Sequence, residues 1–173
     1  IGDQFKFNGK IFVSGRSKVN IKSSDNKVDV KKVIWKFKKS KAKIFKEPFF
    51  LPPNRGVQDI FYNATDSLGN WGKMKKLSVI LDLLPPVMEF KVIGKKISIF
   101  EKSFISPKSQ IVLKAFDSGS GIREIIYRAD KGNEKGPEKG YKKPFNLKEE
   151  GVYNLHYFAR DRVGNRMIEQ KTT

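Results

Sequence analysis

Apolar and polar residues alternate along most of this chain. From Tyr153 to Ala159 every second residue is Tyr, Leu or Ala, and the residues between them include Asn and His. Val33, Trp35 and Phe37 line up in the same way on an earlier segment, with lysine on the opposite face. This period-2 pattern is typical of β-strands with one buried face. Turn-forming residues interrupt it about every ten residues, and no long apolar stripe has helical spacing, so we predict an all-β fold.

An internal repeat sets the domain organisation. Residues 56–70 match residues 151–165 at an offset of 95 positions, and share Gly, Val, Tyr, Ala, Asp, Gly and Asn. Upstream, two stretches within residues 19–35 match stretches within residues 111–127 at an offset of 92 positions. The drift between the two offsets falls between strands, where loops tolerate insertions. The chain is therefore predicted to contain two homologous domains.

The two expected domains cover residues 1–84 and 85–173 and meet near the segment Asp82-Leu-Leu-Pro-Pro86. Trp35 and Tyr127 hold the same position in the two copies. A large ring at this position would fill the centre of a β-sandwich. We therefore expect Trp35 in the core rather than on a ligand-binding surface.

Each copy also carries the motif Ala-x-Asp-x-x-Gly-Asn at the end of a predicted strand. Here the chain must leave one strand and return antiparallel to it. Gly adopts a positive φ without a Cβ clash, and Asn tolerates the left-handed region. The Asp carboxylate can accept backbone N–H bonds from the same turn. The predicted structural turn residues are Asp66, Gly69 and Asn70 in the first copy and Asp161, Gly164 and Asn165 in the second.

The second copy resembles the bacterial immunoglobulin-like repeats of exported envelope and surface proteins of spirochaetes. The resemblance rests on the pattern Asp-Ser-Gly-Ser-Gly-Ile at residues 117–122, on Pro-Phe at 144–145 and on the pattern Gly-x-Tyr-x-Leu-x-Tyr-x-Ala-x-Asp-x-x-Gly-Asn at 151–165. The first copy departs from it, since Gln58 replaces the tyrosine of the second copy. The resemblance implies two tandem immunoglobulin-like β-sandwich domains. It also implies an exported protein, periplasmic or associated with the outer membrane or surface, with another envelope protein as partner.

Charge is the strongest compositional feature. The 173 residues include 36 Lys and Arg against 18 Asp and Glu, for a formal net charge of +18. Of the basic residues 29 are Lys and only 7 are Arg, whereas proteins that read nucleic acids favour the planar Arg fork. Nucleic acid is therefore an unlikely partner. The absence of Cys excludes disulfides and thiolate chemistry, and no apolar run is long enough to predict a transmembrane segment.

Eight of the lysines fall in the sixteen residues from Lys31 to Lys46. Alternation places Lys36 and Lys38 on one exposed strand face. The matching stretch of the second copy mixes lysine with acidic residues, so the fold does not require this block. It is either a solvated edge that lysine protects from aggregation, or a surface for a polyanion such as a cell-wall polymer or glycosaminoglycan. The candidate contact residues are Lys36, Lys38, Lys39, Lys41 and Lys43.

Catalysis and metal binding find little support in the residues present. His156 is the only histidine, and alternation points it to solvent, away from any buried Ser-His-Asp arrangement. Calcium is the other possibility, because aspartates fall in predicted turns and at the junction. These are Asp25, Asp66, Asp82, Asp117 and Asp161. Calcium takes six to eight oxygens and each turn offers one carboxylate, so turn capping is favoured.

We therefore expect no catalytic, metal or cofactor-binding residues. The sequence predicts a non-enzymatic tandem module of a bacterial cell-envelope protein, which acts in protein–protein interaction or as a structural spacer. The alternative is a surface adhesin or polyanion binder that uses the Lys31–Lys46 block. Nucleic-acid binding is the least favoured interpretation.

Overall fold

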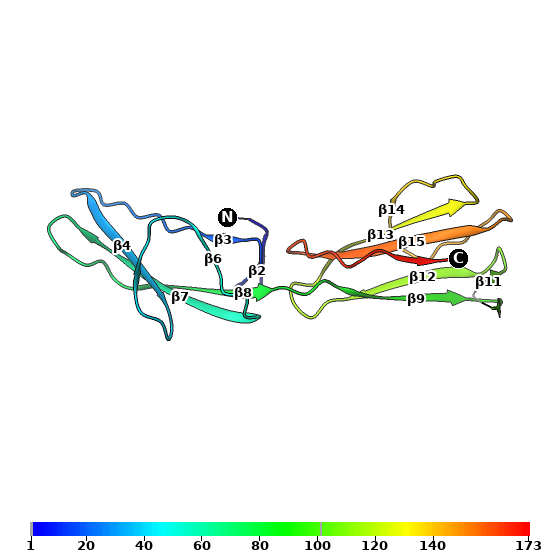
Figure 1. Cartoon of the computed structure of the whole chain (residues 1–173), viewed down its shortest axis with the longest axis horizontal. Coiled ribbons are helices and arrows are strands. Elements are labelled where there is room, and N and C mark those ends of the chain that lie inside the picture. Colours follow the sequence, from blue (N-terminus) through cyan, green and yellow to red (C-terminus); the bar gives the residue numbers. More distant parts are fainter. Residues whose placement is uncertain (1, 101) are drawn as a thin grey trace. The chain divides into compact units, whose positions relative to one another are not determined.

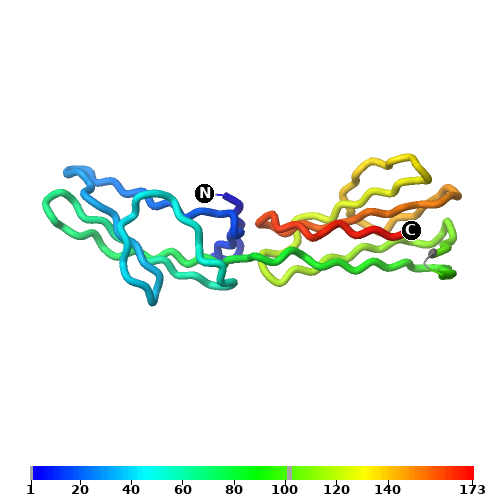
Figure 2. Tube along the Cα trace, in the orientation of Figure 1, coloured from blue at the N-terminus to red at the C-terminus, as the bar shows by residue number. Residues whose placement is uncertain are grey.

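The computed structural model describes residues 2–100 and 102–173, apart from the side chain of Lys102. It divides the chain into two compact units, Ile1–Leu83 (unit 1) and Leu84–Thr173 (unit 2), so the boundary lies one residue before the position expected from the sequence. The described elements are all β-strands (Figure 1), and Figure 2 traces the path of the chain through them. In this part of the chain no helix is long and apolar enough to span a membrane.

Unit 1 is built on a mixed sheet with the strand order β1-β2-β8-β7-β4-β5 and a small sheet, β3-β6. Strands β2 and β8 are parallel, and the other pairs are antiparallel. The strands are β1 (Gln4–Phe7), β2 (Lys10–Ser14), β3 (Lys18–Val19), β4 (Val30–Phe37), β5 (Lys43–Ile44), β6 (Phe49–Phe50), β7 (Gly56–Asp66) and β8 (Lys75–Asp82).

Unit 2 contains a four-stranded sheet with the order β14-β13-β15-β16, a two-stranded sheet, β12-β9, and the hairpin β10-β11. All of its strand pairs are antiparallel. The strands are β9 (Val87–Ile93), β10 (Lys96–Ile99), β11 (Lys102–Ile105), β12 (Gln110–Phe116), β13 (Ile122–Lys131), β14 (Lys139–Gly140), β15 (Tyr153–Asp161) and β16 (Gln170–Thr172).

Each unit has its own apolar core between its sheets. The buried cluster of unit 1 consists of Val13, Ile21, Trp35, Ile60, Val79 and Leu81. That of unit 2 consists of Ile111, Leu113, Leu155 and Tyr157. Trp35 stacks on Phe49 with ring centroids 3.5 Å apart, and Tyr127 stacks on Phe145 at 4.2 Å. The large rings that share a repeat position therefore fill equivalent places, and each buried apolar side chain contributes about 1.5–3 kcal/mol to its unit.

Strand β15 has a buried ring on its outer face, which the alternating pattern did not predict. Leu155 and Tyr157 face the core, but Phe158 on the other face is also buried. The guanidinium groups of Arg160 and Arg166 lie 5.3 and 3.8 Å from its ring centroid. Cations over an aromatic face are attracted by its quadrupole, so charged side chains cover this ring.

The units differ in the segment that follows the hairpin β1–β2 in unit 1 and the hairpin β10–β11 in unit 2. In unit 2, β12 pairs with β9 over its whole length, from Gln110↔Ile93 to Phe116↔Val87. The matching residues of unit 1 are 18–24, of which only Lys18 and Val19 belong to a strand, paired with β6. In the part of the chain that the structure describes, residues 20–24 have no strand beside them. This segment borders a groove of unit 1.

Candidate functional site

The predicted turn of unit 1 closes on the carboxylate of Asp66. Its Oδ1 accepts the backbone N–H groups of Leu68 and Asn70, both at 2.9 Å, and its Oδ2 accepts Nδ2–H of Asn70 at 2.9 Å. Gly69 has a φ of 89°, in the region that favours glycine. The Asn70 side chain and these backbone donors lower the pKa of Asp66, because they stabilise its charged form.

The turn of unit 2 has the same geometry but is buried. Asp161 is 0% exposed, and its Oδ1 accepts the N–H groups of Val163 at 2.9 Å and Asn165 at 2.7 Å. Its Oδ2 accepts Nδ2–H of Asn165 at 2.7 Å, and Gly164 has a φ of 80°. Both Asp-Gly-Asn turns therefore use their polar atoms to hold the chain reversal.

The other loop aspartates also cap their own loops. Asp25 accepts the N–H groups of Lys27 and Val28 at 2.8 and 3.1 Å, and these bonds lower its pKa. In unit 2, Asp117 accepts the N–H groups of two glycines, at 2.9 and 2.7 Å. Oxygens of Asp117 and Asp161 lie within 4.8 Å of each other, which brings two negative charges together at the turn end of unit 2.

His156 lies on the expected outer face of β15, but the expectation that it points to solvent is wrong. Its side chain is only 19% exposed, because Glu169 and Asp130 flank the ring at 2.9 Å from Nδ1 and 3.3 Å from Nε2. Arg128 bonds to Asp130 at 2.8 Å and is the main cause of the lowered pKa of that carboxyl. The ring is thus held between two carboxylates, and one of them, Asp130, is also paired with the Arg128 guanidinium.

The lysine block forms a hairpin of unit 1. Strand β4 ends at Phe37, where the Ser40 hydroxyl accepts the Phe37 N–H at 2.9 Å and the Ser40 N–H donates to the Phe37 carbonyl at 3.1 Å. Lys36 therefore lies on the strand and is half-buried, whereas Lys38 lies in the turn and is exposed. The prediction that these two share one exposed strand face is wrong, because the bonds between Phe37 and Ser40 close a turn that begins at Lys38. We call residues Lys36, Lys38, Lys39, Lys41 and Lys43 the lysine hairpin.

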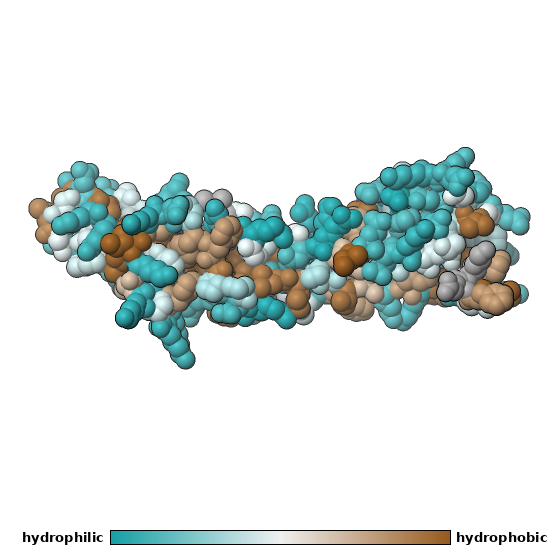
Figure 3. All heavy atoms as spheres, viewed as in Figure 1, coloured by the Kyte–Doolittle hydropathy of each residue, from teal (hydrophilic) through white to brown (hydrophobic). Residues whose placement is uncertain are grey.

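The charge of the lysine hairpin is only weakly compensated. Of the ion pairs that the structure describes, none includes one of its five lysines. Lys38 contributes to the lowered pKa of Asp59, but the hydrogen bond from Ser78 and the contact with Lys76 contribute more. The Lys43 Nζ lies 5.7 Å from the ring centroid of Trp35. Figure 3 shows hydrophilic side chains at the protruding end of this β4–β5 connection.

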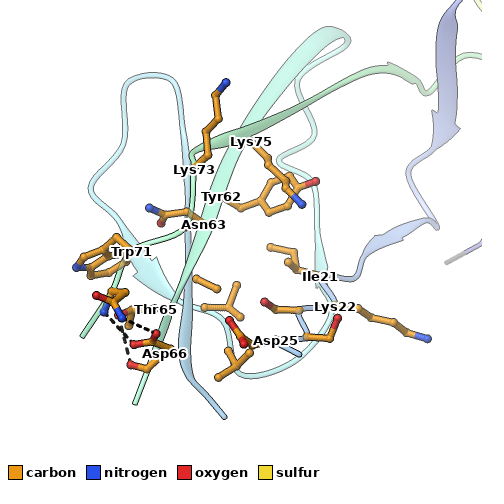
Figure 4. Close-up of a pocket in the computed structure, with 17 residues that line it drawn as sticks. Ile21, Lys22, Asp25, Tyr62, Asn63, Thr65, Asp66, Trp71, Lys73 and Lys75 are labelled. Carbon is orange, nitrogen blue, oxygen red and sulfur yellow. Dashed lines mark hydrogen bonds between the residues drawn. The ribbon is translucent and has the colours of Figure 1, made fainter. Parts of the chain in front are cut away.

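A groove of about 470 Å³ in unit 1 is the feature that sequence reasoning missed (Figure 4). Residues 21–25 form one wall, Tyr62 and its β7 neighbours form the floor, and Lys73 and Lys75 lie opposite. Trp71 at one end is 51% exposed, and the Lys32 Nζ lies 5.4 Å from its ring centroid. A sequence signal exists, because the apolar residues Val112, Ala115 and Phe116 of β12 are matched in unit 1 by the polar residues Asn20, Ser23 and Ser24.

Comparisons with known proteins add one structural likeness. No family model matches the chain, and no curated protein matches it either. Among solved structures it is similar to the fibronectin(III)-like modules of Clostridium thermocellum CbhA. The two share 14% sequence identity with a TM-score of 0.48, over 92% of this chain and 85% of that chain. The sheets and cores described above decide the fold class. The chain consists of two immunoglobulin-like β-sandwiches.

Such sandwiches carry function on loops and strand edges rather than in a fixed pocket. Two surfaces of unit 1 meet that description: the lysine hairpin, and the groove beside the open edge at residues 20–24. The hairpin offers positive charge, and the groove offers unpaired backbone next to apolar side chains. Both surfaces are therefore candidates for contact with another molecule.

Proposed function

We propose that the chain is a non-enzymatic binding module of an exported bacterial envelope protein, and that unit 1 contacts another envelope protein through the lysine hairpin. The observation that carries the proposal is the positive charge of that hairpin, in which four of the five lysines are exposed and none belongs to a described ion pair. The motif resemblance of the second copy supports the envelope location. In this proposal unit 2 serves as a spacer built on the same fold.

Comparison with unit 2 argues that the hairpin charge serves a contact and not the fold. In the corresponding β13–β14 region Lys131 pairs with Glu149 at 2.6 Å and Arg128 pairs with Asp130. These pairs neutralise the charge locally, and the sandwich forms with them. Unit 1 forms the same sandwich without such pairs on its hairpin. Like charges held close together repel. A cluster of lysines without ion pairs therefore favours a role in contact with an acidic partner.

Apolar surface next to the lysines favours a protein over a pure polyanion. Ile44 follows Lys43 on β5 and is 58% exposed. Protein interfaces combine a buried apolar centre with a polar rim, whereas contact with a polyanion depends mainly on charge. An acidic protein surface with an apolar pocket would satisfy both kinds of residue.

A second candidate is binding of a polyanion such as a glycosaminoglycan or cell-wall polymer. Five lysines within eight residues give a dense local charge that releases counterions on contact with a polyanion. This candidate makes a different prediction about salt, because its affinity comes from charge alone.

The two candidates can be separated with one pair of variants. The first replaces the five residues of the lysine hairpin with glutamine. The control replaces five exposed lysines of unit 2 with glutamine, so the net charge changes equally. These are Lys135, Lys139, Lys142, Lys143 and Lys148. We expect the wild type and the control to bind washed envelopes of the producing bacterium in 0.5 M salt, and the hairpin variant to lose at least about tenfold in affinity.

Retention on immobilised heparin decides the alternative. A wild type that binds heparin at low salt, loses envelope binding in 0.5 M salt and needs the hairpin for both is a polyanion binder. Equal envelope binding by the hairpin variant and the wild type would contradict both candidate functions, because both assign binding to the lysine hairpin.

A further inference from the structure

The groove of unit 1 lies where unit 2 places a strand. Residues 21–25 form its wall, and in unit 2 the matching residues belong to β12, which pairs with β9. Ile21 corresponds to Leu113, and both are buried core residues. The strand β9 therefore covers in unit 2 the edge that borders the groove in unit 1.

The floor of the groove supports the same correspondence. Tyr62 in the groove occupies the repeat position of Tyr157 in unit 2. The Phe90 ring of β9 stacks on Tyr157, with centroids 5.7 Å apart and planes 18° apart. Figure 4 shows the Tyr62 ring at the groove, beside Lys75. The groove thus has room where unit 2 has the inward side chain of an edge strand.

Unit 1 also contains the connection that leads from β9 into the β10–β11 hairpin in unit 2. Gly94 follows β9 with a φ of 119°, and a Cβ there would lie 2.9 Å from Oγ of Ser109. Gly2 has a φ of 112°, and a Cβ there would lie 3.0 Å from Cα of Ser17. Each serine hydroxyl donates to the carbonyl of the residue after its glycine, at 2.9 and 2.7 Å. The backbone of Gly2 therefore lies as close to Ser17 as that of Gly94 lies to Ser109.

Charge along the edge indicates which side chains a strand would present. In β9, Glu89 lies opposite Lys114 of β12. The Lys91 hydrogen bond is the first cause of the lowered pKa of Glu89, and Lys114 adds to it. Lys22 holds the repeat position of Lys114 and lines the groove. An acidic residue opposite Lys22 and an apolar one over Tyr62 would reproduce the pattern of β9.

We propose that the groove is the seat of an antiparallel β-strand joined to the chain ahead of Gly2, in the position that β9 holds in unit 2. The strand is extended and presents apolar residues to the floor at alternate positions. It pairs with the backbone of residues 20–24, which follows β3 directly and matches residues 112–116 of β12. The groove is then a structural seat and not a pocket for a small molecule, and filling it leaves the lysine hairpin free.

The test adds the six residues Val-Met-Glu-Phe-Lys-Val directly ahead of residue 1 of the full chain. Together with Ile1 they repeat the sequence of β9, Val87–Ile93. The matched control adds Met-Val-Phe-Glu-Val-Lys, which has the same composition but would place Glu over Tyr62 and Phe opposite Lys22. Both tryptophans of the protein lie in unit 1, so tryptophan fluorescence follows the melting of this unit alone.

We expect the first addition to raise the Tm of unit 1 by about 5 °C or more and to slow amide hydrogen exchange at residues 20–24. The control addition leaves both unchanged. Equal effects of the two additions, no effect of either, or loss of the fold with the first would overturn the proposal. It would also be overturned if the free β9 peptide raised the Tm and the joined strand did not, since the seat would then serve a separate molecule.

Discussion

Replacing Trp35 with alanine will lower the free energy of unfolding of unit 1 by about 3–5 kcal/mol. The indole is 8% exposed, stacks on Phe49 and meets the edge of Phe37 at 5.4 Å between centroids. Its removal therefore leaves a cavity at the centre of the core, in addition to the lost burial. Denaturant unfolding followed by the fluorescence of the remaining Trp71 measures the effect.

The matched control is Trp71→Ala. Trp71 is 51% exposed at the end of the groove, and we expect its loss to cost less than about 1 kcal/mol. In this variant Trp35 remains as the reporter. If the two variants were destabilised equally, Trp35 would not be the centre of the core of unit 1.

Replacing Asp161 with alanine will destabilise unit 2 by about 2–4 kcal/mol. The carboxylate is fully buried and accepts three hydrogen bonds, from the backbone of Val163 and Asn165 and from the Asn165 side chain. Without it these donors are left in a place that water reaches poorly, and a buried donor without a partner costs free energy. Relief of the repulsion from nearby Asp117 offsets only part of this cost.

Asp66→Ala is the natural comparison, because Asp66 makes the same three hydrogen bonds at an exposed turn. Water can replace the carboxylate there, so we expect unit 1 to lose clearly less stability than unit 2 loses with Asp161→Ala. Scanning calorimetry of the full chain resolves the effect on unit 2, and tryptophan fluorescence follows unit 1. A milder effect at position 161 than at position 66 would show that burial does not set the importance of the turn.

The elements that local sequence determines were predictable. The alternation and the repeat predicted the all-β class and the two related sandwiches. The turn motif is set within five residues, and Trp35 and Tyr127 share a repeat position and a place in their cores. Each of these features depends on residues close in sequence or on the comparison of the two copies.

The features that the sequence did not predict depend on neighbours brought together by the fold. His156 is covered because Asp130 lies on the adjacent strand β13 and Glu169 directly precedes β16. The strand β4 ends before Lys38 because a serine side chain closes the turn. The groove was missed because it arises from an unpaired edge, and pairing between distant segments leaves only a weak trace in a single copy.

We propose that the protein works by contact through the lysine hairpin. Site-specific photo-crosslinking tests it most directly, with the crosslinking residue placed at Lys39 in one variant and at Lys142 of unit 2 in the other. Both positions are exposed. In washed envelopes of the producing bacterium, we predict one discrete protein adduct from position 39 that persists in 0.5 M salt, and none from position 142. No adduct at position 39, or the same adducts at both positions, would contradict the claim.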